Sequence, residues 1–157
     1  ENAQLANQIA SLCLVNLGMN LKAVHYAKFA LAMDSEDSNA ALMAAIASAN
    51  MEKADEAKDF FSMAVASDEP SREALTSYAA FLEINEDFGQ ALNLLERYEE
   101  LFGDTMDTIV ARARIYDKTG KADKAVAEYR TALLSGYEIP TDLKRYIQGR
   151  VAVAKQK

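Results

Sequence analysis

Few residues in this chain could do chemistry. The single histidine, His25, lies between apolar residues at a position expected to face outward on a helix. The single cysteine, Cys13, lies in the apolar run 12–15 without a cationic neighbour, so a small core residue is a better interpretation than a nucleophile. Since catalysis needs convergent reactive groups, we expect that the chain is not an enzyme.

Metal and cofactor sites are not indicated either. The acidic run 34–37 lacks the glycine and the terminal glutamate of an EF-hand loop, which favours a solvated turn. No glycine-rich phosphate loop and no Gly-x-Ser-x-Gly turn occur. One cysteine cannot form an internal disulfide or anchor a metal site by itself. We therefore predict no cofactor, and the cysteine count leaves the compartment open between the cytoplasm and a bacterial periplasm.

Composition and charge further narrow the class of protein to which the chain can belong. Half of the 157 residues are apolar, alanine dominates, and only two prolines occur, which predicts helix throughout. The net charge of −7 comes without a positive stripe, so nucleic acid binding is not expected. The only basic cluster lies on the last predicted helix and is interpreted as a solvated face: Lys144, Arg145, Arg150, Lys155 and Lys157. No apolar run approaches the ~20 residues of a membrane span. The start at Glu1 fits either a removed leader or a piece of a longer protein.

A fixed period of 34 residues organises the chain. Ala23, Ala57, Ala91 and Ala125 follow one another at this spacing, and no insertion or deletion interrupts the register. The period defines four units, residues 4–37, 38–71, 72–105 and 106–139, followed by a tail over residues 140–157. Each unit splits into two helical patterns joined by a short turn, which forces antiparallel neighbours.

Helix positions follow from this period. The first helices are predicted over residues 4–17, 38–50, 71–84 and 105–118, and the second over residues 21–33, 54–67, 88–101 and 122–135. Ser38, Ser71 and Thr105 are the expected N-caps, and Gly120 sets the last turn. The tail is expected to be a capping helix that starts at Pro140 and Thr141, with one apolar stripe: Leu143, Tyr146, Ile147, Val151 and Ala154.

Comparison of the units predicts the packing. Positions 8 and 20 of the units are small, so paired helices can approach closely. Position 27 is alanine in three units but Tyr98 in the third, where looser packing or a shifted neighbour is expected. The larger core residues are predicted to be Leu14, Phe61, Leu82, Leu95, Tyr116 and Tyr129.

This pattern resembles the tetratricopeptide repeat family over nearly the whole chain. The period, the small residues at positions 8, 20 and 27, and the turn over residues 120–125 carry the resemblance. No unit has the family's tryptophan at position 4, Arg112 stands at the usually apolar position 7, and Pro70 is the only proline to close a unit. The resemblance implies an all-α, right-handed α-α superhelix of about nine helices in a single repeat domain.

In that family the first helix of each unit lines a groove, chiefly with positions 2, 5, 9, 12 and 13. The resemblance implies these candidate partner-binding residues here: Leu12, Val15, Asn16, Leu42, Ile46, Asn50, Thr76, Glu83, Arg114 and Lys118. Some members grip a terminal carboxylate with Lys at position 5 and Asn at position 9, and those residues are absent from all four units. The implied groove is apolar in its first half and polar in its second, which suits an amphipathic helix or a hydrophobic peptide.

Three hypotheses about function stay open at this point. The first is a non-enzymatic scaffold or adaptor that recruits a protein or peptide into the groove. The second is a structural role, in which the chain self-associates or is a slice of a longer protein, such as a bacterial envelope or secretion-assembly component. Leu5, Leu12 and Leu42 would then be packing residues covered by another segment. In the third, catalysis lies in a further domain.

Overall fold

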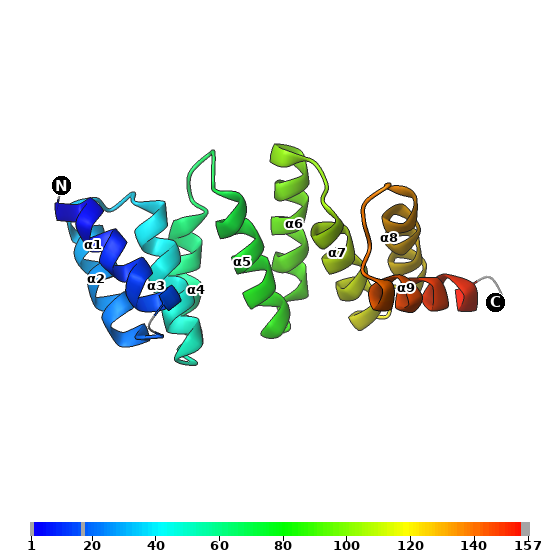
Figure 1. Cartoon of the computed structure of the whole chain (residues 1–157), viewed down its shortest axis with the longest axis horizontal. Helices are drawn as coiled ribbons and strands as arrows, with labels where there is room; N and C mark the ends of the chain where they lie inside the picture. Colours follow the sequence, from blue (N-terminus) through cyan, green and yellow to red (C-terminus); the bar gives the residue numbers. More distant parts are fainter. Residues whose placement is uncertain (1, 17, 155–157) are drawn as a thin grey trace. The chain divides into compact units, whose positions relative to one another are not determined.

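The chain folds entirely into helices and turns wherever its structure is described. The computed structural model describes residues 2–16 and 18–154, and these contain nine α-helices, one π-helical segment and no strand (Figure 1). In chain order they are α1 (Asn2–Ser11), η1 (Leu12–Asn16), α2 (Asn20–Met33), α3 (Ser38–Asn50), α4 (Ala54–Ala64), α5 (Arg72–Ile84), α6 (Phe88–Phe102), α7 (Met106–Lys118), α8 (Ala122–Leu134) and α9 (Thr141–Ala154). This confirms the all-α prediction.

The chain divides into two compact units within α5, between Phe81 and Leu82. Unit 1 holds α1 to α4 and most of α5, and unit 2 holds the last turn of α5 together with α6 to α9. The right-handed superhelical path concerns how such units follow one another and stays a prediction.

Small side chains at facing positions build the core of unit 1. Ala6, Ala30 and Ala40 form one buried cluster between α1, α2 and α3, and Ala10, Ala27 and Ala44 form the next. Since none of these side chains extends beyond a methyl group, the three helices pack at short range. Cys13 is buried in a third cluster, which confirms its interpretation as a small core residue.

Aromatic rings fill the space between α4 and α5 in unit 1. Phe61 of α4 is buried and stacks on Tyr78 of α5, with ring centroids 5.1 Å apart and planes at 6°. Phe81 of α5 packs on the ring of Phe61, with ring centroids 5.2 Å apart. The prediction that Phe61 is a core residue is confirmed.

The core of unit 2 includes the tail helix. Ile109, Ala113, Ala125, Tyr129 and Ala132 form one buried cluster, and Ile147 of α9 completes it. Leu143 and Val151 pack against the same cluster, which confirms the predicted capping helix. Tyr98, at the position where the other units have alanine, is buried and meets Phe102 edge to face.

Each helical pair is closed by a turn whose middle residue has positive φ. These residues are Gly18, Glu52, Glu86 and Gly120, with φ of 59°, 59°, 61° and 73°, and they are spaced by the 34-residue period. In the last three pairs the following N–H bonds a carbonyl five residues back: Lys53 to Ser48, Asp87 to Leu82 and Lys121 to Tyr116. Two glutamates therefore hold a conformation that favours glycine.

The first pair differs, and here the helix prediction was wrong. The regular helix expected over residues 4–17 ends at Ser11 and continues as the π-helix η1. Met19 accordingly bonds the carbonyl of Cys13, six residues back, at 2.7 Å. A π turn holds one extra residue, which apolar periodicity does not reveal. Residue 17 lies outside the described residues.

Two other predicted boundaries need correction. Asp37, not Ser38, caps α3, because its carboxylate accepts the Ala40 N–H at 2.9 Å. Helix α4 ends at Ala64 instead of residue 67, and Val65 and Pro70 are buried in the segment that follows it. Ser71 and Thr105 are confirmed as N-caps. Their hydroxyls accept hydrogen bonds from the backbone N–H groups of Ala74 and Thr108, at 3.1 and 3.3 Å.

The strained turns make a testable prediction. Exchanging Glu86→Gly should stabilise the protein by about 1 kcal/mol, because a left-handed backbone costs a non-glycine residue roughly that much. Glu86→Ala is the matched control, since it removes the same carboxylate without relieving φ. Chemical denaturation checks both variants, and equal effects of the two exchanges would contradict the strain argument.

Candidate partner-binding surfaces

The first-helix face of unit 1 presents apolar side chains to solvent. Leu5, Leu12 and Val15 are exposed on α1 and η1, and we call these three residues the α1 stripe. Gln8 and Asn16 are exposed beside them. All five predicted groove positions of the first repeat are therefore accessible, and their part in binding stays a prediction.

The second repeat contributes less to this surface than expected. Leu42 of α3 is only 2% exposed. Ile46 is half-buried and packs against the cluster that contains Cys13. Asn50 is exposed and donates to the side chain of Asn20 at 3.2 Å. Leu42 is thus buried by the chain itself, whereas the alternative interpretation had expected another segment to cover it.

Thr76 of α5 is half-buried and bonded within its own helix. Its hydroxyl donates to the carbonyl of Arg72 at 2.9 Å and lies 3.3 Å from that of Glu73. This internal bonding occupies its donor.

In unit 2 three predicted groove residues form one ionic cluster. Glu83, 6% exposed, lies in the last turn of α5. Arg114 of α7 donates to both of its oxygens, from Nε at 2.6 Å and from Nη2 at 2.7 Å, and Lys118 Nζ lies 2.9 Å from Oε1. The hydrogen bond from Arg114 lowers the pKa of Glu83 against the opposing effect of burial. Arg114 and Lys118 remain about half-exposed, and Ile84 beside Glu83 is 80% exposed.

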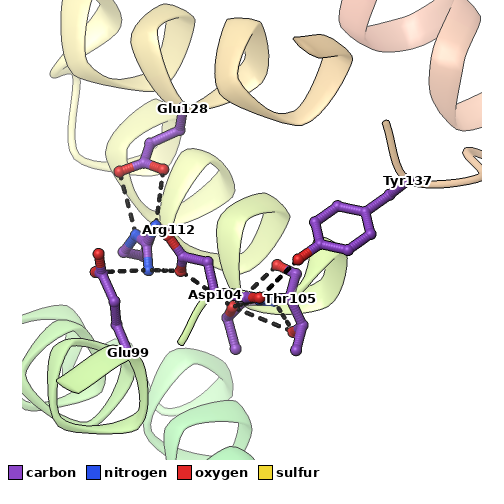
Figure 2. Close-up of polar contacts among 7 residues, drawn as sticks. Glu99, Asp104, Thr105, Arg112, Glu128 and Tyr137 are labelled. Atoms are coloured by element: carbon purple, nitrogen blue, oxygen red, sulfur yellow. Dashed lines mark hydrogen bonds and ion pairs between the residues drawn. The ribbon is translucent and has the colours of Figure 1, made fainter. Parts of the chain in front are cut away.

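A second ionic cluster surrounds Arg112, whose side chain is only 6% exposed. Figure 2 shows its guanidinium between the carboxylates of Asp104 and Glu128, with Glu99 alongside. Nη1 and Nη2 donate to Asp104 at 2.7 and 3.0 Å, and Nε and Nη2 donate to Glu128 at 3.1 Å each. Nη1 also pairs with Glu99 at 3.3 Å. Burial acts to lower the pKa of Arg112, but these bonds raise it above its ordinary value.

The Arg112 cluster ties four segments of unit 2 together. Its carboxylates come from α6, from the turn before α7 and from α8, and Arg112 itself lies on α7. The Tyr137 hydroxyl donates to the carbonyl of Asp104 at 2.8 Å, which adds the segment after α8 (Figure 2). Sequence reasoning noted Arg112 as a departure from the repeat pattern but did not identify its partners. The sequence signal that could have indicated these partners was a cationic side chain at a helix position that is usually apolar.

Asp117 of α7 fixes the capping helix. It accepts from the Tyr129 hydroxyl at 3.1 Å and from Arg150 Nε at 3.1 Å, and a second bond joins it to Arg150 Nη2. The bond to Asp117 raises the pKa of Arg150. The sequence analysis interpreted Arg150 as part of a solvated basic face. The bonds to Asp117 correct that interpretation for this residue. Arg145 pairs with Asp142, and Lys155 and Lys157 of that cluster lie outside the described residues.

His25 is exposed, as predicted, and its ring meets Tyr26 edge to face. The described residues hold no group of three or more His, Cys, Asp or Glu side chains that could bind a metal ion. Among the described helices, none has the length and apolar character needed to cross a membrane.

Solved structures similar to this chain include tetratricopeptide repeat (TPR) proteins. PilW, a widely conserved type IV pilus biogenesis factor, aligns with a TM-score of 0.81 and 18% identity over 93% of this chain and 67% of its own. A MamA protein aligns at 0.79 and 18% identity over 99% and 82%. YrrB, a TPR protein with an unusual peptide-binding site, aligns at 0.72 and 22% identity over 83% and 66%. No family model and no curated protein matches the sequence.

The repeat geometry and these similarities agree on the fold. Helical pairs at a 34-residue period, small residues at the packing positions and a terminal capping helix are shared features of a TPR solenoid. The chain has the tetratricopeptide repeat fold.

The Arg112 cluster should contribute strongly to stability. We expect Arg112→Met to destabilise the protein by about 2–3 kcal/mol, because three carboxylates lose their shared cation. The loss stays below that of a fully buried pair because Glu99 is half-exposed and can be hydrated. Arg130→Met, an exposed exchange on α8, is the control and should change the free energy of unfolding little. Urea denaturation measures both, and equal stabilities would contradict this role.

The Glu83 cluster predicts a pH dependence. The folded-state pKa of Glu83 lies below its ordinary value of 4.5, so its ion pairs stabilise the fold above that pH and are lost as pH falls through the lowered value. Glu83→Gln should therefore cost about 1–2 kcal/mol at neutral pH. The difference from the unsubstituted protein should vanish in acid below the folded-state pKa. Glu100→Gln, on the exposed face of α6, serves as the control, and a pH-independent effect of Glu83→Gln would refute the assignment.

Proposed function

We propose that the chain is a non-enzymatic protein-interaction scaffold whose α1 stripe binds an apolar peptide segment or an amphipathic helix. The observation that carries the proposal is the exposure of Leu5, Leu12 and Val15 on α1 and η1. A large apolar side chain gains about 1.5–3 kcal/mol on full burial, so three in a row supply a useful binding energy.

The chemistry of the stripe favours an apolar partner. No charged side chain lies on α1 or η1, and Gln8 and Asn16 supply amide groups beside the apolar residues. An amphipathic helix that lays its apolar face on the stripe would desolvate no ion. Leu42 is buried and offers no surface to a partner, and Ile46 is half-buried against the cluster that contains Cys13.

A second first-helix surface, in unit 2, suits a segment with acidic residues. Arg114 and Lys118 are held in place by Glu83 while remaining half-exposed, and Ile84 offers an apolar contact beside them. Fixed cations lose little side-chain freedom when they bind a carboxylate.

The similar structures support the general class. YrrB is described as a TPR protein with an unusual peptide-binding site, and PilW is described as a type IV pilus biogenesis factor. The likeness to PilW favours, as a second candidate, a component of a bacterial envelope or secretion assembly.

Affinity capture with matched variants tests the proposal. Leu12→Asp with Val15→Asp should remove the proteins that the unsubstituted chain captures from a cell extract, because a charge on the stripe opposes desolvation. Leu134→Asp, on an exposed residue of α8, should capture the same proteins as the unsubstituted chain. Asn50→Asp places a charge at the end of α3, and the same capture assay tests whether the binding surface extends to that helix.

Circular dichroism confirms that each variant is folded. Unchanged capture by the folded Leu12→Asp, Val15→Asp variant would sink the α1 stripe as a binding surface. Loss of capture by Leu134→Asp would show that the effect is not specific to the stripe.

A further inference from the structure

We infer that a second copy of this chain docks on the outer face of α2. Four residues spaced four apart, Leu21, His25, Phe29 and Met33, form an exposed row that we call the α2 ridge. Leu21 is 73% exposed, and Phe29 and Met33 are 48% exposed each. This surface is separate from the α1 stripe, and the inference does not depend on the function proposed above.

The ridge is not required by the repeat fold. The buried face of α2 consists of other residues, namely Ala23, Val24, Ala27 and Ala30. At the four ridge positions the later repeats are mostly polar or small: Asp55, Asp59, Met63 and Ser67; Gly89, Asn93, Arg97 and Leu101; and Asp123, Ala127, Thr131 and Ser135. Only the first repeat carries three large apolar residues there, so packing within the chain does not explain them.

An open hollow lies at the N-terminal end of the ridge. It has a volume of about 580 Å³ and is lined mostly by apolar atoms of Met19, Leu21 and Met51, together with Gly18, Asn20 and Lys22. Met33 stands at the opposite end of the same ridge, twelve residues or about 18 Å further along the helix. A protruding side chain and a receptive hollow therefore occupy the two ends of one helix.

This arrangement is self-complementary under a twofold axis. If two α2 helices pack antiparallel about Ala27, Met33 of each copy meets the hollow beside Leu21 of the other. Phe29 of each copy then faces His25 of the other. Both contacts form twice, as an isologous interface requires, and the flexible Met33 can adapt to the hollow.

The charges on this face permit the contact. Helix α2 has no acidic residue, and in the antiparallel register Lys22 lies opposite Ala32 and Lys28 opposite Tyr26. Lys28 is also paired with Glu56 of the adjacent α4 at 2.6 Å. Across α2, α4 and the turn between α3 and α4, four lysines balance four acidic residues: Lys22, Lys28, Lys53 and Lys58, and Glu52, Asp55, Glu56 and Asp59. The acidic excess of unit 1 therefore lies mainly elsewhere, and two such faces do not repel each other.

Sedimentation over a concentration series tests the interface. The unsubstituted chain should dimerise as its concentration rises, and Phe29→Asp should weaken dimerisation by about tenfold or more. Met63→Asp is the matched control, because Met63 holds the same repeat position on α4 and is 41% exposed. It should leave dimerisation unchanged. A chain that stays monomeric to its highest soluble concentration, or a dimer that Phe29→Asp leaves intact, overturns the inference.

Disulfide trapping tests the register. A mixture of a Leu21→Cys chain and a Met33→Cys chain should form a mixed disulfide, whereas Leu21→Cys alone should not, because its two copies lie about 18 Å apart. The native Cys13 is buried and does not compete. Disulfides between two Leu21→Cys chains would overturn the antiparallel register. A dimer lost in Leu12→Asp but kept in Phe29→Asp would place the contact on the α1 stripe and also overturn the inference.

Discussion

The structure depends on the close approach of the two helices within each repeat. One position of the second helix, occupied by Ala23, Ala57, Ala91 and Ala125, is completely buried in all four repeats. A larger side chain there would separate the paired helices and open voids around the residues that now fill the core. Because a helical pair is thin, it cannot bury its own apolar face and needs a neighbour or a cap. The tail helix α9 serves this need for the last pair.

The two units meet this constraint with different chemistry. Unit 1 is held by alanine contacts between α1, α2 and α3 and by the rings of Phe61 and Tyr78. Unit 2 adds charged side chains with little exposure, Glu83 and Arg112, each satisfied by two or more partners of opposite charge. Ion pairs weaken when a partner is neutralised, whereas apolar contacts do not, so solution conditions act unequally on the two units.

The sequence predicted the architecture well because the 34-residue period repeats without interruption. A periodic signal averages over four copies, so local exceptions do not hide it. The exceptions are what the sequence did not predict. The π-helical end of the first helix leaves the apolar spacing intact, and the burial of Leu42 depends on how the helices pack around it. The partners of Arg112 are distant in sequence, and only the packing of α6, α7 and α8 brings them together. Of the candidate positions, Leu12 and Val15 are exposed and Leu42 is buried, and their part in binding stays a prediction.

The burial of Cys13 within η1 has a practical consequence. Its thiol is the only one in the chain and is shielded while the end of the first helix is docked. A thiol reagent can reach it only when that segment opens, so its rate of modification measures the free energy of local opening. The protein thus carries its own reporter for the segment next to the α1 stripe, and ligands that clamp this segment would slow the labelling in proportion to their occupancy.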